Sequence, residues 1–256
     1  MIRKIDTNWK ICDAFIWRGD YLHPIKEFNA FELDDLIGID EQKEVLLKNT
    51  QSFLDSNTGL NVLLYGPRGC GKSTLARAVF TRFLDSGLKI VQLSTKDIEV
   101  LPILVDAMRV QPHKFIVFCD DLSFELGDLS YKALKVVLDG SLEKIPSNVI
   151  LYATSNRKHI MAEYESDNLG TTIINRELHF SDAVEERISL SDRFGLSIPF
   201  YKINAEEYLR IINIYLEEDL SEELKIKALS YATQKGQRSG RVAYDFIRAI
   251  KIGLIK

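Results

Sequence analysis

The sequence has few cysteines, little net charge and no long apolar run. Its three cysteines, Cys12, Cys70 and Cys119, are scattered and odd in number, which argues against a disulfide framework and indicates reduced thiols in a cytoplasmic protein. The formal net charge of −4 gives no general electrostatic argument for binding nucleic acid, although a local basic groove is compatible with it. No apolar run approaches the length of a membrane span. We therefore expect a soluble cytoplasmic protein that does not partner with a membrane.

Other absences narrow the class of protein further. The four histidines are dispersed and lie beside no cysteine pair, which argues against a zinc-ligand cluster. No appended nucleic-acid-binding module is evident. Hydrophobic residues make up 46% of the chain, which is enough for a sizeable core, and 256 residues accommodate a medium domain followed by a small one.

Apolar runs that alternate with helical patterns indicate the fold class. The runs "NVLLYG", "LKIVQLS", "KFIVFCD", "NVILYATSN" and "LSIPF" are largely unbroken, which is typical of parallel strands covered on both faces. From residue 204 onward three amphipathic helical segments follow one another without a strand. We predict an N-terminal arm over residues 1–30, an α/β domain with a five-stranded parallel sheet over 31–202, and a small all-helical domain over 203–256.

The segment "YGPRGCGKST" carries the clearest chemical motif. It contains the pattern G-x-x-x-x-G-K-S and lies between a predicted strand and a predicted helix, as a phosphate-binding P-loop requires. Glycines let successive backbone N–H groups turn towards a phosphate, and the helix N-terminus adds the positive end of its dipole. Lys72 is expected to reach the outer phosphates of ATP, and the Ser73 hydroxyl is expected to bind Mg²⁺. The loop residues expected to contact the nucleotide are Gly66, Pro67, Arg68, Gly69, Cys70, Gly71, Lys72, Ser73 and Thr74.

Two adjacent aspartates end the predicted strand "KFIVFCD". Carboxylates at the end of a buried strand need a compensating cation, and the P-loop supplies one in the form of Mg²⁺. We assign Asp120 to the metal and Asp121 to the water molecule that attacks ATP. Glu125, four residues beyond Asp121, is a rival for the water-orienting role.

With these motifs in place, the chain resembles the AAA+ ATPases. The resemblance implies that a polar residue after the next strand senses the γ-phosphate, and "NVILYATSN" supplies Asn156, with Thr154 as the alternative. It implies an arginine finger at Arg193 in "SLSDRFGL", which would act on the nucleotide of a neighbouring subunit. An Asp-Arg-Phe-Gly turn that only forms a surface ion pair is the alternative for this segment.

The same resemblance implies further nucleotide contacts. Arg241 in "GQRSGRVAYDFI" would reach the phosphates from the helical domain, with Arg238 as the alternative. Ile37 and Gly38, after Leu36 in "LDDLIGIDEQ", would contact the adenine, although core packing explains the apolar residues equally well.

At closer range the chain is similar to a bacterial family of uncharacterised ATP-binding AAA+ proteins, known only as a domain of unknown function. The segments that carry this similarity are "FCDDLSFE", "SYKALKVVLDGSLE", "YATSNRKH", "SLSDRFGL" and "RSGRVA", and it extends from about residue 28 to the end. The family implies nucleotide binding and little more.

Two functions follow from the motifs. One is an oligomeric Mg-ATP-hydrolysing ATPase that remodels or loads an unidentified protein partner. The other is an ATP-dependent binding switch with little turnover, since an aspartate in the second acidic position is similar to that of replication initiators and helicase loaders. The segment after the second strand, "LSTKDIEV", has no aromatic residue or glycine, which argues against a polypeptide-threading unfoldase. The long segment 157–189, in which "SDAVEERIS" is expected to form a short helix, is the expected place for contacts with a partner.

Overall fold

The computed structural model describes residue 5 and residues 7–124, 129–140, 146–156, 172–174, 177–179, 190–216 and 219–255. Glu125, the expected helix at 181–189 and most of the segment 157–189 lie outside these residues. The strands are β1 (Ala14–Trp17), β2 (Leu22–Pro24), β3 (Val62–Tyr65), β4 (Leu88–Leu93), β5 (Lys114–Cys119), β6 (Val149–Ser155), β7 (Thr172–Ile174), β8 (Glu177–His179) and β9 (Leu196–Pro199). The α-helices are α1 (Asp40–Ser56), α2 (Lys72–Phe83), α3 (Leu101–Arg109), α4 (Tyr131–Asp139), α6 (Ala205–Leu216), α7 (Glu222–Gln234) and α8 (Gly240–Lys251), and the 3-10 helices are η1 (Leu84–Ser86) and η2 (Thr95–Val100).

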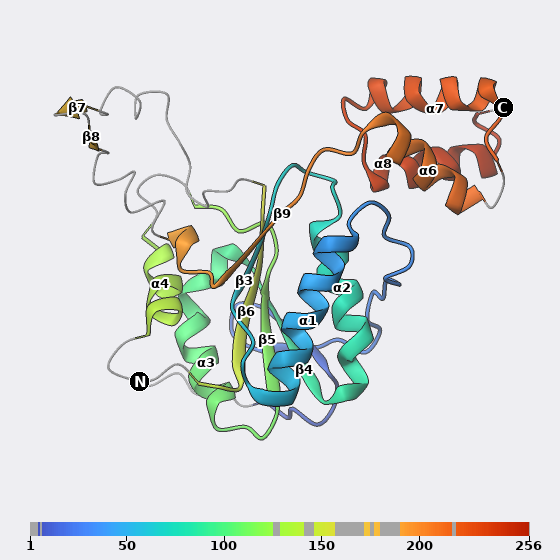
Figure 1. The fold of residues 1–256 in the computed structure, drawn as a ribbon. Coiled ribbons are helices and arrows are strands. Elements are labelled where there is room, and N and C mark those ends of the chain that lie inside the picture. The colour runs from blue at the N-terminus through green and yellow to red at the C-terminus, as the bar shows by residue number, and fades with distance from the viewer. Residues whose placement is uncertain are drawn as a thin grey trace.

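The main sheet has seven strands in the order β2-β1-β4-β5-β6-β3-β9 (Figure 1). The five strands β4, β5, β6, β3 and β9 are parallel, as predicted from their unbroken apolar runs. Their carboxyl ends therefore meet at one edge of the sheet, where β3 leads into the P-loop and β5 into the paired aspartates. A separate antiparallel pair is formed by β7 and β8.

The strand count differs from the predicted five because β1 and β2 extend the sheet. Both lie within residues 1–30, which were expected to form an arm; β1 is parallel to β4 and β2 is antiparallel to β1. Phe15 and Trp17 of β1 are buried, and Trp9 packs edge to face on Phe15. The Lys89 ammonium of β4 donates to Asp13 Oδ1 at 2.6 Å. The strands have only four and three residues in a mixed aromatic and charged sequence, too short for a periodic pattern to mark them.

Helices cover both faces of the sheet (Figure 1). On one face, α3 and α4 contribute Leu101, Leu104 and Leu134 to a cluster of buried side chains. On the other face, α1 and α2 contribute Leu46 and Leu75 to a second cluster. The P-loop helix α2 therefore belongs to one face of the sheet and α4 to the other.

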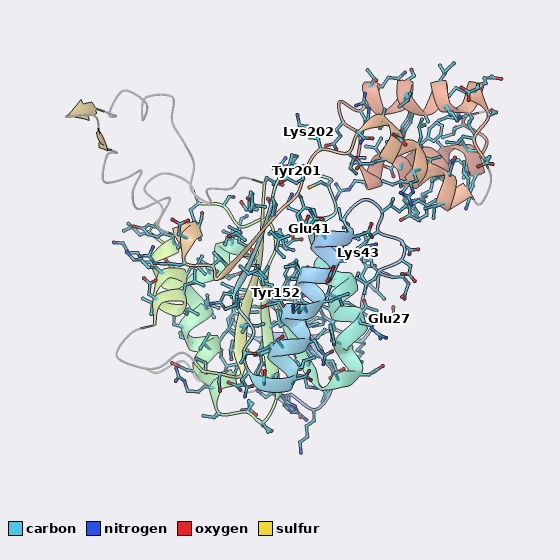
Figure 2. The ribbon with its side chains drawn as sticks, in the orientation of Figure 1. Glu27, Glu41, Lys43, Tyr152, Tyr201 and Lys202 are labelled. Carbon is cyan, nitrogen blue, oxygen red and sulfur yellow. The ribbon has the colours of Figure 1, made fainter. Side chains whose placement is uncertain are left out.

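Helices α6, α7 and α8 pack around a third apolar cluster that includes Tyr208, Ala228 and Phe246. In Figure 1 they form a group beyond the edge of the sheet at which the parallel strands end. Residues 201–204 connect β9 to this group, and Figure 2 shows Tyr201 and Lys202 on the connection, with Glu41 and Lys43 at the start of α1. No helix among the described residues is long and apolar enough to cross a membrane.

A buried polar network joins β6 to α1. Tyr152, labelled in Figure 2, is fully buried, and its hydroxyl lies 2.8 Å from Thr50 Oγ1 and accepts from Asn49 Nδ2 at 3.0 Å. Burial raises the pKa of Tyr152 to about 12, so the hydroxyl stays protonated at physiological pH. The Asn49 side chain also bonds both backbone groups of Leu60, which fixes the chain just before β3.

Substituting Tyr152→Phe is expected to lower the free energy of unfolding by about 1–2 kcal/mol, because Asn49 and Thr50 lose a partner that water does not replace in the core. Urea unfolding of the nucleotide-free protein measures the change. Tyr201→Phe is the matched control, since Tyr201 is 72% exposed and should change stability little. Equal midpoints for both variants would contradict a stabilising role for the network.

Candidate active site

The P-loop is a tight turn between β3 and α2 that depends on its glycines. Gly66, Gly69 and Gly71 have φ angles of 143°, 78° and 95°, a region that residues with a Cβ rarely adopt. A Cβ on Gly66 would lie 2.2 Å from the Phe200 carbonyl oxygen, so a side chain there would collide with backbone. Gly71 then directly precedes the first residue of α2, and the helix N-terminus faces the loop.

The Lys72 ammonium lies inside the loop. Its Nζ atom donates to the carbonyl oxygens of Gly66 at 2.7 Å and Pro67 at 2.8 Å, and to Asn156 Oδ1 at 3.2 Å. Burial lowers the pKa of Lys72, while the hydrogen bond to Cys70 and the nearby Asp121 and Asp120 carboxylates oppose that shift. A desolvated ammonium surrounded by glycine-rich backbone is well suited to an anionic ligand, because the charge is poorly compensated by neutral carbonyls.

The Asp120 carboxylate organises the opposite wall of the site. Its Oδ1 atom accepts from Ser73 Oγ at 2.5 Å and from Thr154 Oγ1 at 2.7 Å. Its Oδ2 atom lies 3.6 Å from Arg77 Nη2 of α2. Ser73 and Asp120, predicted from the sequence to bind the metal, are thus brought together by α2 and β5.

Asp121 adopts a backbone conformation that few residues tolerate. Its φ angle is 56°, in the left-handed region where aspartate and asparagine are enriched among non-glycine residues. Its backbone N–H donates to Thr154 Oγ1 at 2.9 Å, and its side-chain Oδ1 accepts from Asn156 Nδ2. Because Asn156 also accepts from Lys72, one amide joins the two candidate catalytic groups.

The two oxygen donors fit a magnesium ion. A serine hydroxyl and a carboxylate are hard oxygen ligands, and Mg²⁺ in phosphate sites typically takes one or two protein groups and completes its shell with water and phosphate. Ser73 Oγ and Asp120 Oδ1 lie on adjoining walls beside the P-loop and are already 2.5 Å apart. The donor set is therefore suited to a magnesium–nucleotide complex.

The α6–α8 group and the segment before α1 approach the loop from outside the sheet. Ile37 packs against the apolar cluster of these helices, and a Cβ on Gly38 would lie 3.4 Å from Glu207 Oε1. A Cβ on Gly69 would lie 2.6 Å from Ser239 Cβ, so the start of α8 almost touches the phosphate loop.

The two arginines predicted as alternatives flank Ser239, which accepts from Val242 N at 3.2 Å as the N-cap of α8. Arg238 precedes this cap and Arg241 is in the first turn of the helix, and both are exposed. Both assignments therefore remain predictions; the close approach of Ser239 to Gly69 places the backbone at the start of α8 beside the loop.

The third predicted arginine lies elsewhere. Arg193 Nε donates to Asp139 Oδ1 of α4 at 2.5 Å, and its neighbour Phe194 belongs to the apolar cluster on the α3–α4 face. The α2 helix that carries Lys72 covers the opposite face. Arg193 is thus separate from the other predicted residues of its own chain, which is compatible both with action on a neighbouring subunit and with a surface ion pair.

Sequence reasoning missed two contributions to the site. Arg77 approaches the Asp120 carboxylate. The available signal was its spacing, because a residue four positions after Ser73 lies on the same side of the helix. Thr154 was considered only as a γ-phosphate sensor, whereas its hydroxyl holds Asp120 Oδ1 and the Asp121 backbone.

The sheet order, the P-loop after β3 and the carboxylates after β5, with β6 lying between these two strands, define the fold of AAA+ P-loop NTPases. The chain belongs to the family described as "Protein of unknown function (DUF815)", whose model matches residues 10–253. The predicted resemblance to an uncharacterised AAA+ family is therefore confirmed.

Known AAA+ proteins share this fold at low sequence identity. The Holliday junction branch migration complex subunit RuvB of Mycoplasma pneumoniae is 24% identical over 190 residues, which cover 74% of this chain and 57% of that protein. The structure of the Aeropyrum pernix ORC1 protein in complex with DNA matches with a TM-score of 0.58 at 16% identity and covers 83% of this chain and 59% of that one. AMPPCP-bound DnaA from Aquifex aeolicus matches with a TM-score of 0.54 at 15% identity, covering 84% and 62%. The chain spans less than two thirds of the length of each of these relatives.

Proposed function

We propose that this protein is a Mg-ATP-dependent ATPase that acts on an unidentified partner protein as an oligomer. The observation that carries the proposal is a series of side-chain hydrogen bonds from Lys72 through Asn156 to Asp121. This series lies beside the hydrogen-bonded pair of Ser73 and Asp120. These contacts support the proposal because they bring together a cation suited to bind phosphate, two oxygen donors suited to a metal ion and a carboxylate suited to orient water.

Each group has a defined task in this proposal. Lys72 and the loop N–H groups bind the phosphates, and Ser73 and Asp120 hold the magnesium ion, which neutralises phosphate charge when bound. Asp121 orients a water molecule and accepts its proton as the water oxygen bonds to the γ-phosphorus; the bond from that phosphorus to the bridging oxygen breaks, and ADP and phosphate leave. Asn156 is the γ-phosphate sensor in this proposal, and its hydrogen bonds to Lys72 and Asp121 support that role by holding it beside both groups.

The proposal includes the organisation of the chain. Residues 31–202, together with the strands β1 and β2 that extend their sheet, form the nucleotide-binding domain, and residues 203–256 form a lid, with Ile37 and Gly38 near the adenine. Arg241 approaches the phosphates from the lid, and Arg193 acts on the nucleotide of a neighbouring subunit. The contact between Gly69 and Ser239 supports the lid assignment, because it joins the two parts at the phosphate loop.

A binding switch with little turnover is the second candidate. It is favoured by the Asp121 conformation, because the short side chain is already hydrogen-bonded to Asn156 and the backbone is held in the left-handed region. Such a carboxylate has limited freedom to approach a water molecule, which favours slow hydrolysis.

Steady-state phosphate release, measured over a hundredfold range of protein concentration, distinguishes the two functions. Turnover per subunit that rises steeply with concentration supports an assembling ATPase. Tight ATP binding with almost no release at every concentration supports the switch. Absence of nucleotide binding would overturn both.

Asp121→Asn is expected to lower turnover by about 100-fold to 10 000-fold while ATP still binds, because the amide is a poor base and orients water less well. Asparagine tolerates the same backbone conformation, so the fold should be preserved. Phosphate release and equilibrium binding of a fluorescent ATP analogue provide the measurement, and Asp97→Asn on η2 serves as the control. Undiminished turnover by Asp121→Asn would assign water activation to another group.

A further inference from the structure

A cavity of about 210 Å³ lies next to the candidate active site, on the α2 face of the sheet. Its walls carry three phenylalanine rings: Phe28 of the segment after β2, Phe80 of α2 and Phe118 of β5. The rings of Phe80 and Phe118 meet edge to face at a centroid distance of 5.3 Å. An apolar cavity of roughly 150 Å³ accommodates a benzene molecule, so this one has room for an aromatic ring and a short tail.

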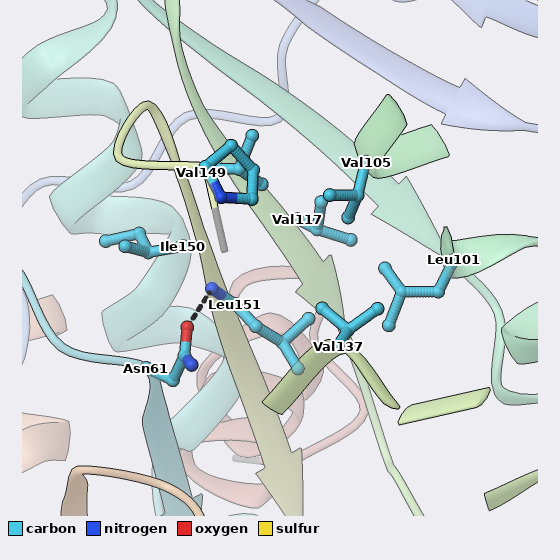
Figure 3. Close-up of a pocket in the computed structure, with 9 residues that line it drawn as sticks. Asn61, Leu101, Val105, Val117, Val137, Val149, Ile150 and Leu151 are labelled. Carbon is cyan, nitrogen blue, oxygen red and sulfur yellow. Dashed lines mark hydrogen bonds between the residues drawn. The ribbon is translucent and has the colours of Figure 1, made fainter. Parts of the chain in front are cut away.

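The N-terminal segment that forms the outer wall is held at both ends. The Ile25 N–H donates to the Ala14 carbonyl oxygen at 2.8 Å, and the Phe31 N–H donates to Thr81 Oγ1 of α2 at 3.4 Å. The cavity is thus a feature of the packed fold. By contrast, the apolar gap drawn in Figure 3, between Val105, Val117 and Val137, has a volume of only about 10 Å³, which is too small for a ligand.

Charged side chains give the cavity a preference for one kind of ligand. Arg77 lines it and provides a guanidinium with five N–H donors, of which one nitrogen faces Asp120 at 3.6 Å. That distance is longer than a charge-assisted hydrogen bond, so Arg77 retains capacity for a second carboxylate. Glu27, exposed beside α2 in Figure 2, also lines the cavity, and its negative charge disfavours ligands that carry more than one negative charge.

We propose that this cavity binds a small aromatic monocarboxylate, with the ring among Phe28, Phe80 and Phe118 and the carboxylate on Arg77. The site is distinct from the phosphate loop and is connected to it through the Arg77–Asp120 contact. A bound carboxylate draws the guanidinium from Asp120 and leaves Oδ2 of that residue available to the magnesium ion. The ligand therefore strengthens Mg-nucleotide binding, and this second step rests on the proposed function.

Calorimetric titration of the full chain with 3-phenylpropionate tests the site itself. Wild type and Arg82→Gln, a control on an exposed position of the same helix, are expected to bind equally. Arg77→Gln is expected to bind at least tenfold more weakly, with Arg77→Lys between the two, because lysine keeps the charge and loses the planar fork. Phe28→Ala removes one of the rings that line the cavity and should also weaken binding of 3-phenylpropionate. This variant provides the test if Arg77→Gln does not fold. Phenethylamine, with the same ring and the opposite charge, should bind poorly to every variant.

The proposal is overturned if wild type binds no 3-phenylpropionate at millimolar concentration. It is equally overturned if Arg77→Gln binds as well as wild type, or if phenethylamine binds as tightly, since both results describe unspecific partition of a ring.

The connection to the nucleotide is measured separately by binding of Mg-AMPPCP with and without saturating 3-phenylpropionate. We expect the ligand to tighten nucleotide binding about fivefold, and the nucleotide to tighten ligand binding by the same factor, since coupling is reciprocal. Absence of Mg-AMPPCP binding overturns the proposed ATPase and leaves the cavity standing. Normal nucleotide binding without coupling overturns the Arg77 connection.

Discussion

Replacing Lys72 by methionine is expected to weaken ATP binding about 100-fold, a difference of roughly 2.7 kcal/mol. Lys72 is 6% exposed, and its ammonium is held by two loop carbonyls and an amide inside the glycine-rich loop, where a phosphate would add a full negative charge in direct contact. Hydrogen bonds to a charged group contribute about 1.5–3 kcal/mol, which is the size of the expected loss. Equilibrium titration with a fluorescent ATP analogue measures the change.

Lys48→Met is the matched control, because Lys48 is exposed on α1 and should not affect ATP binding. The fold should survive the Lys72 change. Methionine has a similar length. Burial of the Lys72 ammonium costs free energy, as the lowered pKa of Lys72 reflects, and removing that cost offsets the lost hydrogen bonds. Unchanged ATP affinity in a folded Lys72→Met protein would remove the P-loop assignment and with it the proposed function.

Arg193→Ala is expected to lower the turnover number about 1000-fold and to leave ATP affinity nearly unchanged. An arginine supplied by a neighbouring subunit stabilises transition-state charge and contributes factors of about 10³ to 10⁵ in phosphoryl transfer. The separation of Arg193 from Lys72, on opposite faces of one sheet, is the reason to expect action between subunits. Steady-state phosphate release at high protein concentration measures the effect.

A mixing experiment makes this test specific. Lys72→Met subunits still carry Arg193, so they should restore turnover to Arg193→Ala subunits that bind ATP. Asp139→Ala releases Arg193 from its ion pair and should preserve turnover. If Arg193→Ala and Asp139→Ala instead lower the free energy of unfolding by the same amount and leave turnover intact, the role of Arg193 is limited to its ion pair with Asp139.

Much of the fold followed from local patterns. The five parallel strands are apolar runs long enough to identify. The order of strands and helices along the sequence alone predicts that Asp120 and Asp121 lie beside the P-loop. The parts that could not be predicted depend on contacts distant in sequence. The strand at Ala14–Trp17 exists because β4 offers it an edge and Lys89 binds Asp13, and neither signal lies within the strand itself.

The chemistry of the site was predicted in outline and not in detail. Residue types and spacing indicated a phosphate loop and a metal carboxylate. They could not indicate that Thr154 bonds both Asp120 and the Asp121 backbone, because that requires the register of β5 against β6. Nor could spacing reveal the φ angle of Asp121, which results from how the chain leaves the sheet.

The close approach of Gly66 to the Phe200 carbonyl oxygen has a mechanical consequence. The Phe200 N–H donates to the Tyr65 carbonyl oxygen at 2.8 Å, so the residue after β9 is hydrogen-bonded to the last residue of β3, directly before the phosphate loop. The helix α6 begins five residues later, at Ala205. The connection to the helical group is therefore fixed at the phosphate loop itself. A change of one residue in the register of β9 against β3 would move the helical group relative to that loop.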